Sequence, residues 1–204
     1  MDKATSDLST EDKILEAAKN VFVAKGMSGA RMQDIANEAG INKALLHYYF
    51  RSKEKLFEVI FKAAVSRLVP RITTILESDL PLFTKIERFC ENYIETVMQS
   101  PFIPLFVINE MNKQPEEFIL KIWGDQKPGL QIFIHQVEDE VAKGIIKPIH
   151  PHQLLVNIVS LTIFPFIAKP IIFFVTGMES KEYKDFMIAR KKEIPEFIIN
   201  AIKI

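Results

Sequence analysis

The chain contains few of the residues that cross-link or bend small proteins, and it carries no excess charge. Its 204 residues include one cysteine, Cys90, which excludes an internal disulfide and any zinc site built from several cysteines. Lys plus Arg and Asp plus Glu number 26 each, so the formal net charge is zero and gives no reason to expect a polyanionic partner. The lone cysteine fits a reducing compartment, and the polar, acidic start is unlike a signal peptide. We therefore expect a cytoplasmic protein.

The chain has one long apolar run, residues 154–175, which is long enough to span a bilayer. The run contains Asn157, Lys169, Pro165 and Pro170, and a charge buried in lipid is costly. We expect a buried core helix or a subunit-interface helix here. A membrane-associated interaction module remains an alternative, and it predicts fractionation with membranes.

Glycine is also scarce, with seven in the chain, and apolar residues recur at helical spacing, so the sequence predicts an all-α fold. Ser9, Asn42 and Ser52 can each cap the start of a helix. Gly26 and Gly40 can end the first and second helices. The third helix is predicted to run through residue 50.

Prolines punctuate the rest of the chain. The fourth helix should run towards Leu68, near Pro70. Further helices are predicted near 82–99, 102–113, 116–123, 128–143, 152–175 and 180–203. We divide the chain into a three-helix domain, 1–55, and a larger helical domain, 56–204, with the boundary inside the fourth helix.

The run AGINKALLHYYF, residues 39–50, joins two short helices through a tight glycine turn, which is typical of a helix-turn-helix. The second helix of that motif lies in the major groove. Leu46, Tyr49 and Phe50 should pack on the preceding helix, because they recur at helical spacing. The residues then facing outward are Lys43, Ala44, His47 and Tyr48.

This outward set suits DNA chemically. Lysine attracts phosphate or guanine, histidine and tyrosine hydrogen bond to phosphates and base edges, and alanine allows close approach. Residues 31–55 hold five basic and three acidic side chains, a modest local excess of two positive charges. The alternative is an ordinary solvated helix face.

The same region resembles the DNA-binding part of TetR-family transcriptional regulators over residues 13–61. The matching residues are Asp34-Ile35-Ala36, Ala39-Gly40, Lys43, Leu46, Tyr48, Phe50 and Ser52-Lys53-Glu54. The resemblance implies that Lys43, Tyr48 and Lys53 contact the phosphate backbone and that Ala44 lies close to bases. The rest of the chain is similar only in length and helical character. We therefore expect the first domain, 1–55, to be the helix-turn-helix DNA-binding domain and the second, 56–204, to be the ligand-binding and dimerisation domain.

Departures from the family pattern affect four more candidate DNA-binding residues. Arg31 stands where a capping threonine is usual, so it could reach phosphate but could not cap. Leu45 replaces a threonine that often reaches a base, and core packing is its alternative role. His47 and Tyr49 exchange the usual tyrosine and histidine, and Tyr49 could instead pack inside.

The second domain is rich in aromatic residues, which suggests an apolar ligand pocket with a few polar groups. The candidate ligand-binding residues are Phe102, Phe106, Asn109, Glu110, Trp123, Gln131, His135 and Phe166. For each of them ordinary core packing is the competing interpretation. Cys90 is most simply a small buried hydrophobic residue, with a redox sensor as the alternative.

The chain shows no nucleophile motif, Gly-rich phosphate loop or HExxH pattern, so we expect no enzyme and no cofactor. His135, His150 and His152 suggest a metal only weakly, and we assign none.

We expect a homodimer on a palindromic operator, released by a small apolar effector. The expected interface is formed by the helices near 152–175 and 180–203, through Ile158, Phe166, Phe173, Phe186, Phe197 and Ile198. A constitutive DNA-binding regulator without a ligand is the alternative.

Overall fold

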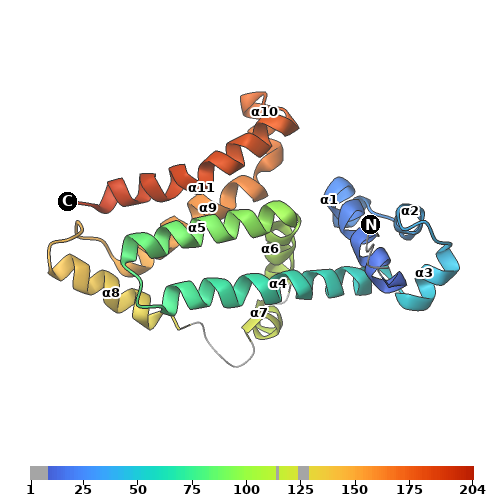
Figure 1. The fold of residues 1–204 in the computed structure, drawn as a ribbon, viewed down its shortest axis with the longest axis horizontal. Helices are drawn as coiled ribbons and strands as arrows, with labels where there is room; N and C mark the ends of the chain where they lie inside the picture. The colour runs from blue at the N-terminus through green and yellow to red at the C-terminus, as the bar shows by residue number, and fades with distance from the viewer. Residues whose placement is uncertain (1–8, 114, 124–128) are drawn as a thin grey trace, which may run out of the picture. The chain divides into compact units, whose positions relative to one another are not determined.

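The computed structural model describes residues 9–113, 115–123 and 129–204, and these ranges are helical (Figure 1). The helices are α1 Thr10–Gly29, α2 Met32–Glu38, α3 Lys43–Tyr49, α4 Lys53–Glu77, α5 Leu82–Gln99, α6 Ile103–Lys113, α7 Pro115–Trp123, α8 Gln131–Ala142, α9 Pro151–Ile167, α10 Lys169–Thr176 and α11 Ser180–Ile202. No strand occurs in the described ranges, where a single isolated bridge pairs Ile146 with Lys203. The predicted all-α fold is confirmed.

The chain forms two compact units, residues 1–64 and 65–204, and the change from one to the other falls inside α4. The split that we predicted from the sequence, after residue 55, lies in the same helix. The roles assigned to the two parts are not tested by this division and stay predictions.

The polar caps predicted for the first unit are present. The hydroxyl of Ser9 accepts from the N–H of Asp12 at 3.2 Å, and that of Ser52 accepts from the N–H of Lys55 at 3.2 Å. Gly26 has a positive φ of 68° and kinks α1, but helical residues resume and continue to Gly29. Gly26 therefore bends the first helix rather than ending it, which corrects the prediction.

Two further helix boundaries differ from the prediction, and both involve proline. Helix α4 continues through Pro70 to Glu77, because Leu68 on one side and Leu76 on the other are buried and hold it in place. The single helix predicted over 152–175 is two helices, because Pro170 cannot donate the next helical hydrogen bond and the chain leaves helical dihedrals at Ala168 (φ −90°, ψ 13°).

Among the described residues, no single helix is both long and apolar enough to cross a membrane. Helices α9 and α10 reach that length and apolar character only as a pair, and the pair is bent by 73° at its break.

The core of the first unit holds the short helices in place. Phe22 of α1 and Phe57 of α4 meet edge to face, with ring centroids 5.1 Å apart. Ile35 of α2 and Leu46 of α3 are completely buried. Burying a side chain of this size stabilises a fold by about 1.5–3 kcal/mol, so both short helices are fixed by their apolar faces.

In the second unit α5 and α11 run side by side, and α9 also packs on α5 (Figure 1). One buried cluster contains Ile86 and Phe89 of α5, Ile158 of α9, and Ile194 and Ile198 of α11. A second cluster joins Tyr93 and Val97 of α5 to Phe166, Tyr183 and Met187. These clusters account for the apolar repeats of the three helices.

Candidate nucleic-acid interface

The turn between α2 and α3 has the tight geometry that the sequence predicted from Gly40. Gly40 has a φ of 66°, a value that favours glycine. The N–H of Ile41 donates to the carbonyl of Ala36 at 3.0 Å, and the N–H of Gly40 donates to that of Asn37 at 3.2 Å. This pair of bonds is a Schellman motif, which satisfies the last carbonyls of α2. The turn therefore sets the direction in which α3 leaves α2.

Asn42 caps α3, as predicted. Its side-chain oxygen accepts from the N–H of Leu45 at 2.8 Å. The cap satisfies one of the N–H groups that the start of a helix leaves without a partner inside the helix.

The residues of α3 separate into a buried side and an exposed side. Leu46 is completely buried and Phe50, which follows α3, is nearly so. Lys43, Ala44 and His47 are exposed, as their spacing predicted. The sequence therefore anticipated the free face of the helix.

Of the aromatic pair at the end of α3, Tyr48 is exposed as predicted, and Tyr49, which we expected to pack inside, is more open than expected. Tyr48 is 80% exposed and Tyr49 is 40% exposed. Their rings meet edge to face with centroids 5.5 Å apart. Tyr49 is thus not buried in the core, and Leu45, at 37% exposure, lies at the border between the two sides.

His47 is oriented by a residue that sequence reasoning counted only as a local positive charge. Its Nδ1 lies 3.3 Å from the backbone carbonyl oxygen of Arg51. The spacing of four residues along the chain could have suggested this contact. Arg51 itself has an exposed side chain, so it adds a cation shortly after the end of α3 in the sequence.

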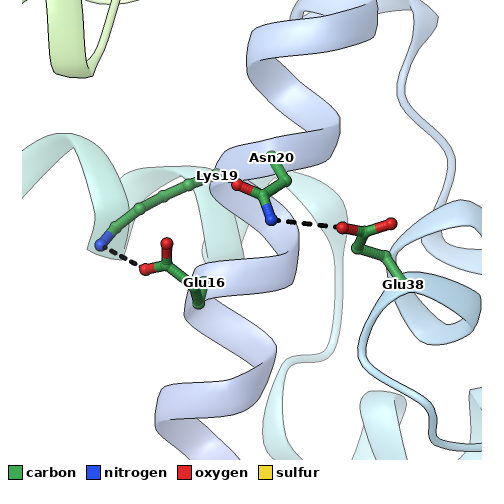
Figure 2. Close-up of polar contacts among 4 residues, drawn as sticks. All are labelled: Glu16, Lys19, Asn20 and Glu38. Atoms are coloured by element: carbon green, nitrogen blue, oxygen red, sulfur yellow. Dashed lines mark hydrogen bonds and ion pairs between the residues drawn. The ribbon is translucent and has the colours of Figure 1, made fainter.

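Helix α2 is attached to α1 at both of its ends by polar contacts. At its start, Lys25 pairs with Asp34 at 3.0 Å. At its end, the amide of Asn20 donates to Glu38 at 3.2 Å, and Glu16 and Lys19 form a separate pair on α1 (Figure 2). These contacts help to hold α2 as the support for α3.

Asp34 supplies one hydrogen bond of a capping box at the start of α2, the bond to the backbone of the cap residue. Its carboxylate accepts from the backbone N–H of Arg31 at 3.1 Å, while the Arg31 side chain makes no capping bond. The hydrogen bond from Lys25 is the main cause that lowers the pKa of Asp34, and the Arg31 backbone adds to it. Arg31 therefore keeps an exposed side chain that is free to extend to phosphate.

The start of α4 adds a second helix terminus close in sequence to α3. Lys53, half-buried, is its first residue, and Ser52 caps it. The pKa of the Glu54 carboxyl is lowered mainly by its hydrogen bond to the backbone N–H of Glu54 itself, then by Ser52. This carboxylate is therefore engaged with the helix terminus.

Comparison with known proteins identifies the region. The family model described as "Bacterial regulatory proteins, tetR family" matches residues 14–60, which cover α1 to the first part of α4. Residues 14–60 therefore match the tetR family, and the helix-turn-helix lies inside the match. The relatives of the chain are transcriptional regulators, and the unit 1–64 carries their helix-turn-helix.

Two relatives extend the match beyond that region. The biofilm operon icaADBC HTH-type negative transcriptional regulator IcaR of Staphylococcus aureus (strain Newman) is 28% identical over 133 residues, 65% of this chain and 68% of IcaR. The HTH-type transcriptional regulator YhgD of Bacillus subtilis (strain 168) is 24% identical over 148 residues, 68% of this chain and 72% of YhgD.

Solved structures share the fold over nearly the whole chain. The ketosteroid transcriptional regulator KstR2 of Mycobacterium tuberculosis gives a TM-score of 0.68 at 15% identity, covering 96% of each chain. The TetR-family transcriptional regulator PfmR of Thermus thermophilus gives 0.62 at 19% identity, covering 93% of this chain and 98% of PfmR. At these identities the likeness shows the fold alone.

The predicted ligand-binding residues are not brought together in the described part of the chain. Phe102 and Phe166 are buried, and Phe106 is partly buried. Gln131 and His135 are exposed on α8, where His135 lies 3.4 Å from Glu138. The side chains of the remaining three candidates lie outside the described residues: Asn109, Glu110 and Trp123. The set as a whole stays a prediction.

Neither of two hollows along the described helices includes a predicted ligand-binding residue. One lies along α1 and α2 beside Asn20, Asp34 and Glu38. The other lies along α4 and α5 beside Arg71 and Arg88. In the described part of the chain, no group of three or more His, Cys, Asp or Glu side chains could hold a metal ion.

The residues predicted for the dimer interface need correction. Ile158, Phe166 and Ile198 are buried inside the chain itself, in the clusters formed with α5, so they cannot also form a contact between subunits. Phe173 and Phe186 are half-buried, and Phe197 is exposed as an interface residue should be. The sequence indicated apolar helices but not which side of each faces inward.

Proposed function

We propose that this TetR-family regulator is a cytoplasmic repressor that binds a palindromic operator as a homodimer and is released by a small apolar effector. The observation that carries the DNA-binding part is the free face of α3, where Lys43, His47 and Tyr48 are exposed on a capped helix held by a buried leucine. Repression is proposed because the relative IcaR is named a negative regulator.

Each exposed residue has a role in this proposal. Lys43 and Tyr48 contact phosphates, and Lys53 does so at the start of α4. Ala44 and His47 meet base edges in the major groove. Arg31, Leu45 and Tyr49 border this surface. One helix reads only a few base pairs, so two copies about 34 Å apart are needed for an operator.

The dimer is supported by exposed apolar residues on the last three helices. Val156 and Phe164 of α9, Ile171 and Phe174 of α10 and Phe197 of α11 are all exposed. Helix α10 contains no buried residue, although five of its eight residues are Ile, Phe or Val. A second copy of the chain would remove this surface from water.

Binding to the DNA that flanks the gene tests the proposal. The double variant His47→Ala plus Tyr48→Ala and the single variant Lys43→Ala should both lose affinity for a palindromic site. Lys62→Ala, which removes an exposed lysine of α4, is the matched control and should bind as the unaltered chain does. Salt dependence that is shallower for Lys43→Ala than for Lys62→Ala would indicate a lost phosphate contact. Weak binding without sequence preference, equal in all variants, would contradict the proposal.

A constitutive regulator is the second candidate. It is favoured by the exposure of Gln131 and His135 and by the absence of any predicted ligand-binding residue from the two described hollows. A thermal-shift screen of apolar compounds separates the candidates. A compound that raises the melting temperature and weakens operator binding supports the effector; no such compound, with robust DNA binding, supports the constitutive form.

A further inference from the structure

The contact between His47 and Arg51 determines which ring nitrogen carries the proton. The partner of His47 Nδ1, at 3.3 Å, is a carbonyl oxygen, and a carbonyl can only accept. The hydrogen must therefore be on Nδ1. In the neutral ring, Nε2 is then left as a bare hydrogen-bond acceptor.

The local structure explains why this carbonyl is available. Arg51 lies between α3 and α4, one residue before the cap of α4. The first carbonyl in the hydrogen-bond ladder of α4 is that of Ser52, which accepts from the N–H of Leu56 at 3.2 Å, while the Ser52 hydroxyl accepts from the N–H of Lys55. The carbonyl of Arg51 therefore lies outside the ladder, where the histidine of the preceding helix contacts it.

An acceptor on this face has a restricted choice of partners. In the major groove, the hydrogen-bond donors are the N6 amino group of adenine and the N4 amino group of cytosine. Phosphate oxygens, guanine O6 and N7 and thymine O4 are acceptors, and none of them can pair with a bare Nε2. A tyrosine hydroxyl, the usual group at this position in the family pattern, could both donate and accept.

None of the neighbouring exposed residues has a side chain that accepts a hydrogen bond without also being able to donate one. Lys43 only donates, Ala44 has no polar side-chain atom, and the Tyr48 hydroxyl does both. His47 is thus the acceptor-only member of this set of four when its ring is neutral.

We propose that His47 is a specificity-determining residue that selects an exocyclic amino group, of adenine or cytosine, through Nε2. The proposal rests on the DNA-binding function proposed above. In this proposal, the backbone carbonyl of Arg51 fixes the tautomer of His47.

The tautomer can be measured without DNA, and the chain contains its own control. The Nδ1 of His150 accepts from the backbone N–H of His152 at 3.3 Å, so His150 must carry its hydrogen on Nε2. Nitrogen-15 spectra of the imidazole rings at alkaline pH should show the Nδ1–H tautomer for His47 and the Nε2–H tautomer for His150. The Nε2–H tautomer at His47 would overturn the proposal.

The second test uses a duplex selected by the unaltered chain from random DNA. Each adenine of that duplex is replaced in turn by purine, and each cytosine by 2-pyrimidinone, which removes one amino group at a time. At one position of each half-site we expect a loss on the order of 5-fold, the value of one hydrogen bond. Purine replacement identifies adenine as the partner, and pyrimidinone replacement identifies cytosine.

The variant His47→Asn tests whether the affinity lost on removal of the amino group comes from a contact made by His47. Its short amide can still donate to the Arg51 carbonyl but cannot extend as far as Nε2, so amino-group removal at the same position should have no effect. Lys62→Ala should keep the full loss. If every amino group can be removed without cost, or if His47→Asn shows the same loss, this inference fails while DNA binding stands. If no duplex is selected, both proposals fail.

Discussion

Arg190 of α11 donates a hydrogen bond of 2.7 Å to the backbone carbonyl of Leu161 in α9. The residue four places after Leu161 is Pro165, which has no N–H, so the helix itself cannot satisfy that carbonyl. The hydroxyl of Tyr183 donates to the carbonyl of Pro165 at 3.0 Å. Helix α11 thus supplies the donors that α9 lacks around its proline.

This arrangement predicts a coupling between two substitutions. Arg190→Met should lower the free energy of unfolding by about 1–3 kcal/mol, because it leaves a buried carbonyl without a donor. Pro165→Ala restores the N–H, so Arg190→Met should cost about 1 kcal/mol less in that background. Urea unfolding of the four proteins measures the coupling. An equal cost in both backgrounds would mean that Arg190 stabilises the fold through some other contact.

Asn42 allows the stability of α3 to be separated from its contact with DNA. Asn42→Ala removes the cap and should lower stability by about 1 kcal/mol. Asn42→Ser and Asn42→Asp both keep a capping oxygen, so both should melt close to the unaltered chain. Asn42→Asp also adds a negative charge at the start of α3, and DNA affinity at low salt should fall on the order of 10-fold. Unchanged affinity of the Asp variant would place this terminus away from phosphate.

Phe174 tests the exposed apolar surface of the last helices. It is 91% exposed on α10, and a second copy of the chain would cover it under the proposed dimer. Phe174→Asp should weaken dimerisation by about 100-fold, as expected for a central interface residue. Ile132→Asp alters an exposed isoleucine of α8 and is the control. Sedimentation velocity over a concentration series measures both. Equal behaviour of the two variants would argue for a different interface.

The sequence predicted the features that depend on neighbours in the chain. The caps at Ser9, Asn42 and Ser52 and the glycine turn at Gly40 follow from local hydrogen bonding and backbone freedom, and all four are found. The exposed face of α3 could also be predicted, because a short helix buries a single stripe of side chains and leaves the opposite side exposed.

The features that sequence analysis missed depend on packing between distant segments. Pro70 costs α4 one hydrogen bond. The helix nevertheless continues, because Leu68 and Leu76 are buried on either side of the proline, and this burial cannot be read from the sequence. Ile158 and Phe174 are equally apolar, yet one packs on α5 and the other faces outward. In an apolar run such as 154–175, hydropathy alone does not distinguish these sides.

Cys90 gives a prediction about alkaline pH. The Thr162 hydroxyl donates to the carbonyl of Ile158 at 2.6 Å, so the Cys90 thiol, 3.5 Å away, is the donor to Thr162. Burial is the main cause that raises the pKa of the Cys90 thiol to about 11. The unfolded thiol ionises at roughly pH 8.5, so folding favours the protonated form. The resulting stability is complete below that pH and is lost as the pH rises towards 11.

This loss of stability should be measurable in the lower part of that pH range. Burial raises the pKa of Tyr183 to about 12 and that of Tyr93 further, so tyrosine ionisation affects stability mainly above roughly pH 10. Between about pH 8 and 10 the free energy of unfolding should fall by roughly 2 kcal/mol more in the unaltered chain than in Cys90→Ala. Cys90→Ala should be the less stable protein at about pH 7, because it leaves a cavity beside Thr162. Urea unfolding at each pH measures both effects, and parallel pH profiles for the two proteins would show that the thiol is not held protonated by the fold.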